Sequence, residues 1–209
     1  MADSTPDRRS TERFLASPVT PVWPLRTERL VLRPWKDDDF DAFFEMQRDE
    51  DVARWLYNDP RDEDESRRLF DYRKISYEMG GNFAWIACVG VAVADGEVVV
   101  DLTLNVRSHE GRGGELGFIV HPRHQGRGYA TEAARALLEW AFEEVGFHRI
   151  YARHEPRNAA SGRVLEKLGM RKEAHFVETE WVKGEWQSDV VYAILDREWA
   201  RQRNFANLS

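Results

Sequence analysis

The amino-acid sequence predicts a mixed α/β domain with one central sheet flanked by helices. Strand-like runs dominate the first half of the chain, a strand–helix–strand–helix unit occupies residues 115–169, and a hairpin pattern follows over 174–200. Elements in this order are typical of a sheet that carries helices on its faces. A chain of 209 residues is long enough to bury one such core and short for two full domains.

The chain begins with a polar, proline-interrupted stretch. Residues 1–24 offer little apolar surface to offset the entropy of ordering, so we expect a flexible arm without a signal peptide. Alternating apolar residues over 25–34 predict the first strand. A helix is expected over 36–56, because an aspartate-rich start precedes aromatic residues at helical spacing. A second helix is expected over 59–81, ended by a pair of glycines.

The pattern in the middle of the chain predicts strands. Two β-rich runs over 82–106 meet at Asp95-Gly96, which is the strongest short signal for a hairpin. A glycine-rich turn then leads to an apolar strand over 115–121. Beyond it, helical and strand patterns alternate. In chain order we expect a helix over 130–145 closed by Gly146, a strand over 148–154, a short helix ended by Gly169, and a hairpin that turns at Lys183-Gly184.

Composition and charge exclude several classes of function. The formal net charge is −7, opposite to the basic balance of a dedicated nucleic-acid binder. No apolar run approaches the ~20 residues of a membrane-spanning helix, so we expect a cytoplasmic protein with neither nucleic acid nor membrane as a partner. The single cysteine, Cys88, lies in an apolar run and is expected to be a buried, inert thiol. No pair of histidines has zinc-site spacing, and we expect no metal.

A basic turn that contains two glycines, Arg123-His124-Gln125-Gly126-Arg127-Gly128, separates the strand over 115–121 from the helix after it. A helix N-terminus presents unpaired N–H groups and a partial positive charge, which together bind anions. Glycines allow positive φ angles and let a ligand approach the backbone closely. The turn therefore predicts a phosphate site, although the same glycines would also suit a tight turn with no ligand.

Two common nucleotide patterns are absent from this turn. No Lys-Ser/Thr pair follows the second glycine, so the magnesium-nucleotide loop lacks its parts. Thr131 stands where the dinucleotide pattern requires a third glycine. These absences favour another kind of phosphate-bearing ligand.

The spacing R-x-x-G-x-G after a strand resembles the acyl-CoA pyrophosphate loop of the GNAT (GCN5-related N-acetyltransferase) superfamily. The segment EPRNAASGRVLEKLGMRKEAHF, residues 155–176, is similar to the later motif of its RimJ/RimL-like branch. The opening LRTERLVLRPWKDDDFDAFFEM and the closing WVKGEWQSDVVYAILDREW are similar to the same branch. The resemblance covers residues 25–200 as one domain and leaves 201–209 as a C-terminal tail.

The resemblance implies a GNAT fold whose twisted mixed sheet splays between the strands over 115–121 and 148–154. Acetyl-CoA would be the co-substrate, with its pantetheine in the splay and its pyrophosphate on the amides of the turn. The arginines of the turn could equally be solvated, and Asn158 could be only a helix cap. The implied cofactor-binding residues are Phe118, Ile119, Val120, Arg123, Gln125, Gly126, Arg127, Gly128, Tyr129, Ala130, Asn158 and Ser161.

The same resemblance implies attack of a neutral amine on the thioester carbonyl. A backbone N–H of Phe118, Ile119 or Val120 would stabilise the oxyanion. Many relatives carry a tyrosine as general acid seven residues after the asparagine, where this chain has Leu165. RimL-like members have a serine three residues after that asparagine, and Ser161 matches it. The alternative is a serine that merely lies on the helix surface.

Glu115 matches a glutamate proposed in that branch to engage the incoming amine. An ordinary glutamate, with a pKa of about 4.3, takes a proton from an ammonium group poorly, so it would act through water or by attracting the cation. The alternative is an exposed carboxylate at a strand end. His154 could reach the acceptor side. Aromatic residues of the first helical region could wall an acceptor pocket or belong to the core: Phe40, Phe43, Phe44, Trp55 and Tyr57.

The weakness of such a base indicates which class of amine can act as the acceptor. An α-amine is about one-tenth neutral at pH 7, whereas a lysine side chain is neutral at less than about one part in a thousand. We therefore expect a protein or peptide N-terminal α-amine or a small-molecule amine. Two alternatives stay open: a non-catalytic acyl-CoA-binding sensor, and an acyltransferase for a larger acyl-CoA. The oligomeric state also stays open, with a homodimer among the options.

Overall fold

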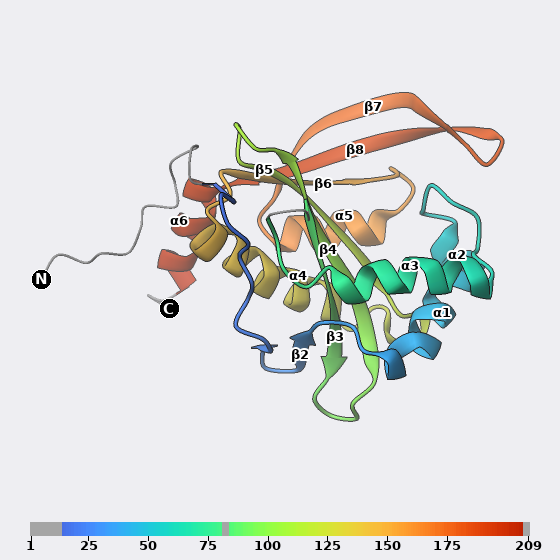
Figure 1. Ribbon diagram of the computed structural model, residues 1–209. Helices are drawn as coiled ribbons and strands as arrows, with labels where there is room; N and C mark the ends of the chain where they lie inside the picture. The colour runs from blue at the N-terminus through green and yellow to red at the C-terminus, as the bar shows by residue number, and fades with distance from the viewer. Residues whose placement is uncertain (1–13, 81–83, 207–209) are drawn as a thin grey trace, which may run out of the picture.

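The computed structural model describes residues 14–80 and 84–206. Within them one mixed sheet of eight strands runs through the molecule, with helices on both faces (Figure 1). Neighbouring strands follow the order β1-β2-β3-β4-β5-β6-β8-β7, and all pairs are antiparallel except β5 with β6. The strands are β1 (Leu25–Arg26), β2 (Leu30–Arg33), β3 (Trp85–Ala92), β4 (Val98–Ser108), β5 (Gly113–Val120), β6 (Arg149–His154), β7 (Arg171–Val182) and β8 (Glu185–Leu195).

The helical elements begin with a divided segment. The single helix predicted over 36–56 is split, because Asp49 has an extended backbone with ψ of 124° and accepts a 2.8 Å hydrogen bond from the Val52 amide. A capping aspartate competes with continuation of the preceding helix. The described helical elements are η2 (Asp37–Asp39), α1 (Phe40–Arg48), α2 (Glu50–Ala53), α3 (Glu63–Ile75), η3 (Pro122–His124), α4 (Tyr129–Trp140), η4 (Ala141–Val145), α5 (Ala159–Lys167) and α6 (Asp196–Ala206).

Alternation along β3 divides the core between the two faces of the sheet. Cys88 packs in one cluster with Leu137 of α4, whereas Ala87 packs in another with Phe43 of α1 and Phe70 of α3. Successive residues of a strand point to opposite faces. Helices α1 and α3 therefore cover one face and α4 the other, as Figure 1 shows. Cys88 is buried, as predicted, and burial raises the pKa of its thiol.

Both predicted hairpins are confirmed. Strands β3 and β4 pair on either side of Asp95-Gly96, and β7 and β8 pair on either side of Lys183-Gly184. Gly146 ends the long helical segment in a left-handed conformation, with φ of 86°. None of the described helices is long and apolar enough to cross a membrane.

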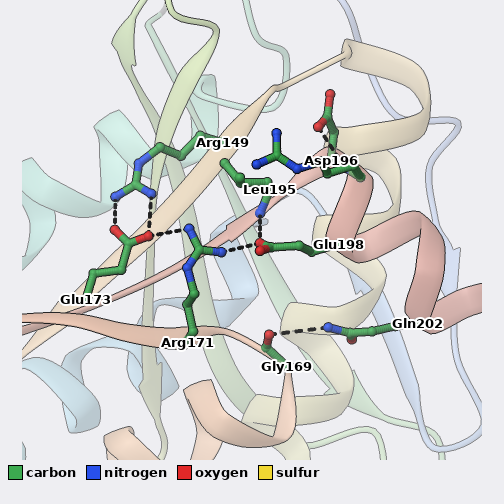
Figure 2. Close-up of polar contacts among 9 residues, drawn as sticks. Arg149, Gly169, Arg171, Glu173, Leu195, Asp196, Glu198 and Gln202 are labelled. Atoms are coloured by element: carbon green, nitrogen blue, oxygen red, sulfur yellow. Dashed lines mark hydrogen bonds and ion pairs between the residues drawn. The ribbon is translucent and has the colours of Figure 1, made fainter.

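The C-terminal segment differs from the prediction. The last strand ends at Leu195 instead of continuing to residue 200, and the chain turns into α6. The buried ring of Trp199 stacks against Phe142 at 5.7 Å, so apolar packing explains why the segment becomes helical. Polar contacts near the start of α6 link α6, β6 and the residues 169–173 that lead into and begin β7 (Figure 2). They are Arg149 with Glu173, Arg171 with Glu173 and Glu198, the Leu195 amide with Glu198, and Gln202 with the Gly169 carbonyl.

Part of the predicted flexible arm packs against the domain. Phe14 and Leu15 are buried, and the Phe14 ring lies 5.1 Å from that of Phe147. Val19 forms a β-bridge with Met79. The prediction is therefore wrong for residues 14–24, and the rest of that arm lies outside the described residues. Of the predicted C-terminal tail, 201–206 belong to α6 and the remainder is not described.

Candidate active site

Strands β5 and β6 separate shortly after they pair. Gly113–Glu115 run parallel to Arg149–Tyr151. Beyond these residues β5 remains bonded to β4 while β6 remains bonded to β8. The facing edges of β5 and β6 therefore carry backbone N–H and C=O groups without a strand partner. The predicted splay of the sheet is confirmed.

A cavity of about 620 Å³ lies at this opening. Residues 116–120 of β5 and 152–154 of β6 line it, together with the start of α4 and one side of α5. Side chains from the segment 52–57 line the same cavity. Arg73 of α3 also lines the cavity, and because α3 and α4 cover opposite faces of the sheet, the cavity connects those two faces. We call the part near α4 and α5 the donor half and the part near residues 52–57 the acceptor half.

The turn before α4 has the features of an anion site. Gly126 and Gly128 have φ angles of 75° and 82°, left-handed values that glycine adopts without strain. A Cβ added at Gly126 would meet no protein atom within 4 Å, so the backbone is open to a ligand. Among the described residues, the amides of 125–128 donate no backbone hydrogen bond. Unpaired amides at a helix start suit the diphosphate of coenzyme A.

Most of the predicted cofactor residues border the cavity, and together they span the splayed strand, the turn and the start of α5. These residues are Phe118, Ile119, Val120, Gln125, Gly126, Gly128, Tyr129, Ala130, Asn158 and Ser161.

Two predicted cofactor residues point elsewhere. The guanidinium of Arg123 lies 3.2 Å from the Glu45 carboxylate, Arg127 is exposed, and neither arginine lines the cavity. The cations that line the donor half are Arg163 and Lys167, one turn apart on α5. Sequence reasoning missed this pair, although its i, i+4 spacing on the predicted helix was a usable signal.

Asn158 and Ser161 lie at the start of α5. The Asn158 side-chain oxygen accepts a 3.1 Å hydrogen bond from the Ser161 amide, so Asn158 is the N-cap of the helix as well as a cavity residue. Among the described residues, the Ser161 hydroxyl makes no hydrogen bond. It is therefore available to a ligand in the donor half.

His154 lies at the end of β6, beside α5. Its Nδ1 is 2.8 Å from the Glu155 carbonyl oxygen, so Nδ1 donates its proton there and Nε2 is an acceptor. Nε2 is buried and has no hydrogen-bond partner in the described part of the chain. A Cβ on Gly162 would lie 3.2 Å from it, so the glycine makes room for the imidazole.

The acceptor half is walled by Trp55 and Tyr57, whereas Phe40, Phe43 and Phe44 belong to the core beneath it. The Tyr57 hydroxyl donates a 2.8 Å hydrogen bond to Asp189 of β8. Burial, with help from this bond, raises the pKa of Tyr57 above its ordinary value. The hydroxyl therefore stays protonated and holds the wall in place.

Glu115 does not border the cavity. Its carboxylate accepts hydrogen bonds from Arg107 Nε at 2.7 Å, from Arg153 Nε at 3.0 Å and from the Tyr151 hydroxyl at 3.3 Å. Arg153 does line the cavity and also contacts Asp189. The carboxylate of Glu115 thus holds Arg153, and contact between Glu115 and an amine stays a prediction.

The cavity also reaches a buried ion pair. Arg73 of α3 and Asp101 of β4 both line it, with 3.1 Å between the guanidinium NH2 and the carboxylate Oδ2. Sequence reasoning missed this pair. The available signal was one carboxylate in the otherwise apolar run VVVDLTL.

A mixed sheet that splays beside an open turn with unpaired backbone amides is typical of acyl-CoA-dependent acyltransferases. The family model described as "Acetyltransferase (GNAT) domain" matches residues 29–171. The chain belongs to this family of acetyltransferases.

Similar proteins carry the same description. The chain is 30% identical over 175 residues to the uncharacterised N-acetyltransferase YnaD of Bacillus subtilis, covering 84% of this chain and 98% of YnaD. It is 31% identical over 88 residues to the [ribosomal protein uS5]-alanine N-acetyltransferase of Escherichia coli, covering 42% of this chain and 45% of that enzyme. The structure of a GNAT-family acetyltransferase from Bacillus anthracis aligns with a TM-score of 0.74 at 28% identity, covering 83% and 99% of the two chains.

A further structural neighbour was solved with its ligands. Spermidine N-acetyltransferase from Vibrio cholerae, in complex with CoA and spermine, aligns with a TM-score of 0.71 over 83% of this chain and 99% of that one. At 21% identity this likeness concerns the fold alone.

Proposed function

We propose that the protein transfers an acetyl group from acetyl-CoA to a primary amine by direct attack in a ternary complex. The acceptor is a protein or peptide N-terminal α-amine or a small-molecule amine. The observation that carries this proposal is one continuous cavity that reaches from the open turn before α4 to an aromatic wall on the opposite face. Two substrates that enter from opposite faces can meet in it without a covalent enzyme intermediate.

The donor half supplies the groups that acetyl transfer needs. Unpaired amides of the turn would hold the diphosphate, and Arg163 and Lys167 would add positive charge. A backbone N–H on the free edge of 118–120 would stabilise the oxyanion. The Ser161 hydroxyl would donate a hydrogen bond to the departing sulfur.

The charges of the acceptor half favour an α-amine over a polyamine. Among the described residues that line the cavity, Asp101 is the one carboxylate, and Arg73 pairs with it. A polyamine with several ammonium groups would need several unpaired carboxylates to replace its hydration. The similarity to the E. coli ribosomal-protein alanine N-acetyltransferase supports the same choice.

A thiol-release assay tests the proposal. Wild-type protein is mixed with acetyl-CoA and with peptides whose N-terminus is free or blocked, alongside spermidine and small amines, and products are identified by mass spectrometry. We expect transfer to the free α-amines and little to the blocked peptides. CoA binding without thiol release on any acceptor would favour a sensor, and faster release from propionyl-CoA or succinyl-CoA would favour a larger acyl group.

A further inference from the structure

We propose that Arg29 is a positioning residue for coenzyme A, because it fixes the peptide unit between Arg127 and Gly128 so that the Gly128 amide faces the diphosphate. Arg29 lies in the turn between β1 and β2, 98 positions before Arg127. Its role rests on acetyl-CoA being the donor in the proposed function.

The Arg29 guanidinium contacts the glycine turn directly. Its Nη1 donates a 3.0 Å hydrogen bond to the Arg127 carbonyl oxygen, and its Nη2 would lie 3.5 Å from a Cβ placed on Gly128. The guanidinium carbon also lies 5.0 Å from the centroid of the Tyr129 ring. Gly128 and Tyr129 line the cavity, whereas Arg29 does not. Arg29 therefore acts on a ligand through the backbone of the turn.

The geometry of a peptide unit gives this contact a consequence for Gly128. In a trans peptide the C=O and the following N–H point in opposite directions. The bond between Arg127 and Gly128 is trans, and the Gly128 amide donates no backbone hydrogen bond among the described residues. Because Arg29 holds the carbonyl oxygen on its own side, the N–H is directed to the opposite side and is available to a diphosphate.

Glycine makes such a restraint necessary. Gly128 has a φ angle of 82°, and glycine populates positive and negative φ about equally. Without a restraint, the peptide unit that precedes Gly128 would rotate at low cost, and ligand binding would have to order it. The hydrogen bond from Arg29 orders the unit in advance, which favours binding.

The Arg29 side chain is itself held by the first turn of α4. The Glu132 carboxylate accepts hydrogen bonds from Arg29 Nε at 2.7 Å, from the Arg29 amide at 2.8 Å and from the Thr27 hydroxyl at 2.6 Å. Arg29 Nη2 lies 2.6 Å from the same carboxylate. A guanidinium carries its donors in a rigid fork, so two nitrogens can pair with Glu132 while the third reaches the Arg127 carbonyl.

The ion pair also cancels an unfavourable charge. Glu132 lies in the first turn of α4, close to the amides that are expected to bind the diphosphate. An unpaired carboxylate at this place would repel an anion, and the Arg29 guanidinium offsets its charge. Charge compensation and orientation can be separated, because a lysine supplies the positive charge without the fork.

The first experiment measures the Kd of CoA by titration calorimetry in Arg29→Met and in a matched control, Arg203→Met. Arg203 is about as exposed as Arg29 and pairs with Glu139 and Glu143, towards the other end of the same helical segment. We expect the Kd to rise about tenfold in Arg29→Met, consistent with the loss of one charge-assisted hydrogen bond, and to keep its wild-type value in Arg203→Met. A wild-type Kd in folded Arg29→Met overturns the proposal.

Arg29→Lys separates orientation from charge, and it decides the question if Arg29→Met does not fold. The lysine keeps a positive charge beside Glu132, so the docking of α4 should survive. It has no second nitrogen to reach the Arg127 carbonyl while it pairs with Glu132. We expect a Kd for CoA close to that of Arg29→Met. A wild-type Kd in Arg29→Lys overturns the orienting role, because charge alone would then be sufficient.

A donor without the diphosphate distinguishes positioning from a general loss of structure. In Arg29→Met, kcat/KM for acetyl-CoA should fall about tenfold, whereas kcat/KM for S-acetylpantetheine should keep its wild-type value. S-acetylpantetheine has the same thioester and pantetheine arm but no diphosphate. An equal fall for both donors overturns the proposal, because a distorted site would affect both.

The outcomes for the wild type separate the role of Arg29 from the proposed function. If the wild type binds CoA but acetylates no amine, the proposed function fails, and the calorimetry still decides the role of Arg29. If the wild type binds no CoA, both fail. If the wild type acetylates an amine and folded Arg29→Met binds CoA equally well, only the role of Arg29 fails.

Discussion

The hydroxyl of Tyr57 donates a 2.8 Å hydrogen bond to the carboxylate of Asp189, across 132 positions of the chain. The contact ties the segment after α2 to β8. Asp189 is buried and also accepts a hydrogen bond from Arg153 at 3.2 Å, and Arg153 in turn contacts Glu115. The aromatic wall of the acceptor half is therefore held by a charged network on the sheet.

Replacing Tyr57 by Phe should loosen this wall. The variant leaves an oxygen of a buried carboxylate without its donor, so we expect a loss of about 1–2 kcal/mol in the free energy of unfolding and a higher KM for the acceptor. Thermal stabilisation by CoA should not change, because the donor half is untouched. Urea unfolding and steady-state kinetics measure both effects, with the exposed Tyr72→Phe as control. Equal acceptor KM values in both variants would contradict the prediction.

Gly126→Val should abolish stabilisation by CoA. A valine side chain at this open turn would occupy the space above the amides, where the diphosphate is expected. Gly96→Val is the matched control, because its φ of 76° matches the 75° of Gly126 and a Cβ at either glycine would meet no protein atom within 4 Å. Both variants should lose similar stability from backbone strain. Differential scanning fluorimetry with and without CoA should separate them, and a retained shift in Gly126→Val would refute the phosphate site.

Ser161→Ala should lower kcat at least tenfold, about 1.4 kcal/mol in the activation free energy, with little change in CoA affinity. The Ser161 amide keeps its bond to Asn158 in this variant, so the start of α5 should remain intact. Titration calorimetry with CoA checks the affinity. An unchanged kcat would contradict this role and indicate that Ser161 merely lies on the helix surface.

Glu132→Gln should make the free energy of unfolding depend less on pH in the acid range. Burial raises the pKa of Glu132, but hydrogen bonds from Thr27 and from the backbone and side chain of Arg29 outweigh burial and lower it. A carboxyl group whose pKa is lowered in the folded state stabilises the fold at pH values above its ordinary pKa of 4.5. This contribution is lost as the pH falls through the folded-state pKa.

The measurement compares urea unfolding of wild type and Glu132→Gln at several pH values. We expect a deficit of about 2 kcal/mol at pH 7 that shrinks below pH 4.5. Glu139→Gln on the same helix is the control, since Glu139 is half exposed and bonded only at the surface to Arg203. A deficit that is independent of pH would contradict the assignment.

Local patterns were sufficient to predict most of the elements in their order and the open turn that borders the donor half. Glycine and its neighbours restrict the backbone within a few residues, so the hairpins at Asp95-Gly96 and Lys183-Gly184 and the turn at Gly126 could be read directly from the chain. The strand-turn-helix pattern then placed an anion site at the start of α4. The two hairpins and the glycine turn depend on sequence neighbours, and the structure contains all three, whereas the anion site at the turn stays a prediction.

Long-range contacts decided the rest. No local pattern shows that Arg123 turns toward Glu45, or that Arg107, Tyr151 and Arg153 occupy the carboxylate of Glu115. The pairing of Asp101 with Arg73 joins β4 to α3, which are brought together only when the sheet and its helices pack. Side-chain charges act over a few ångströms in space whatever their separation in the chain, so these charged contacts emerge only in the folded protein.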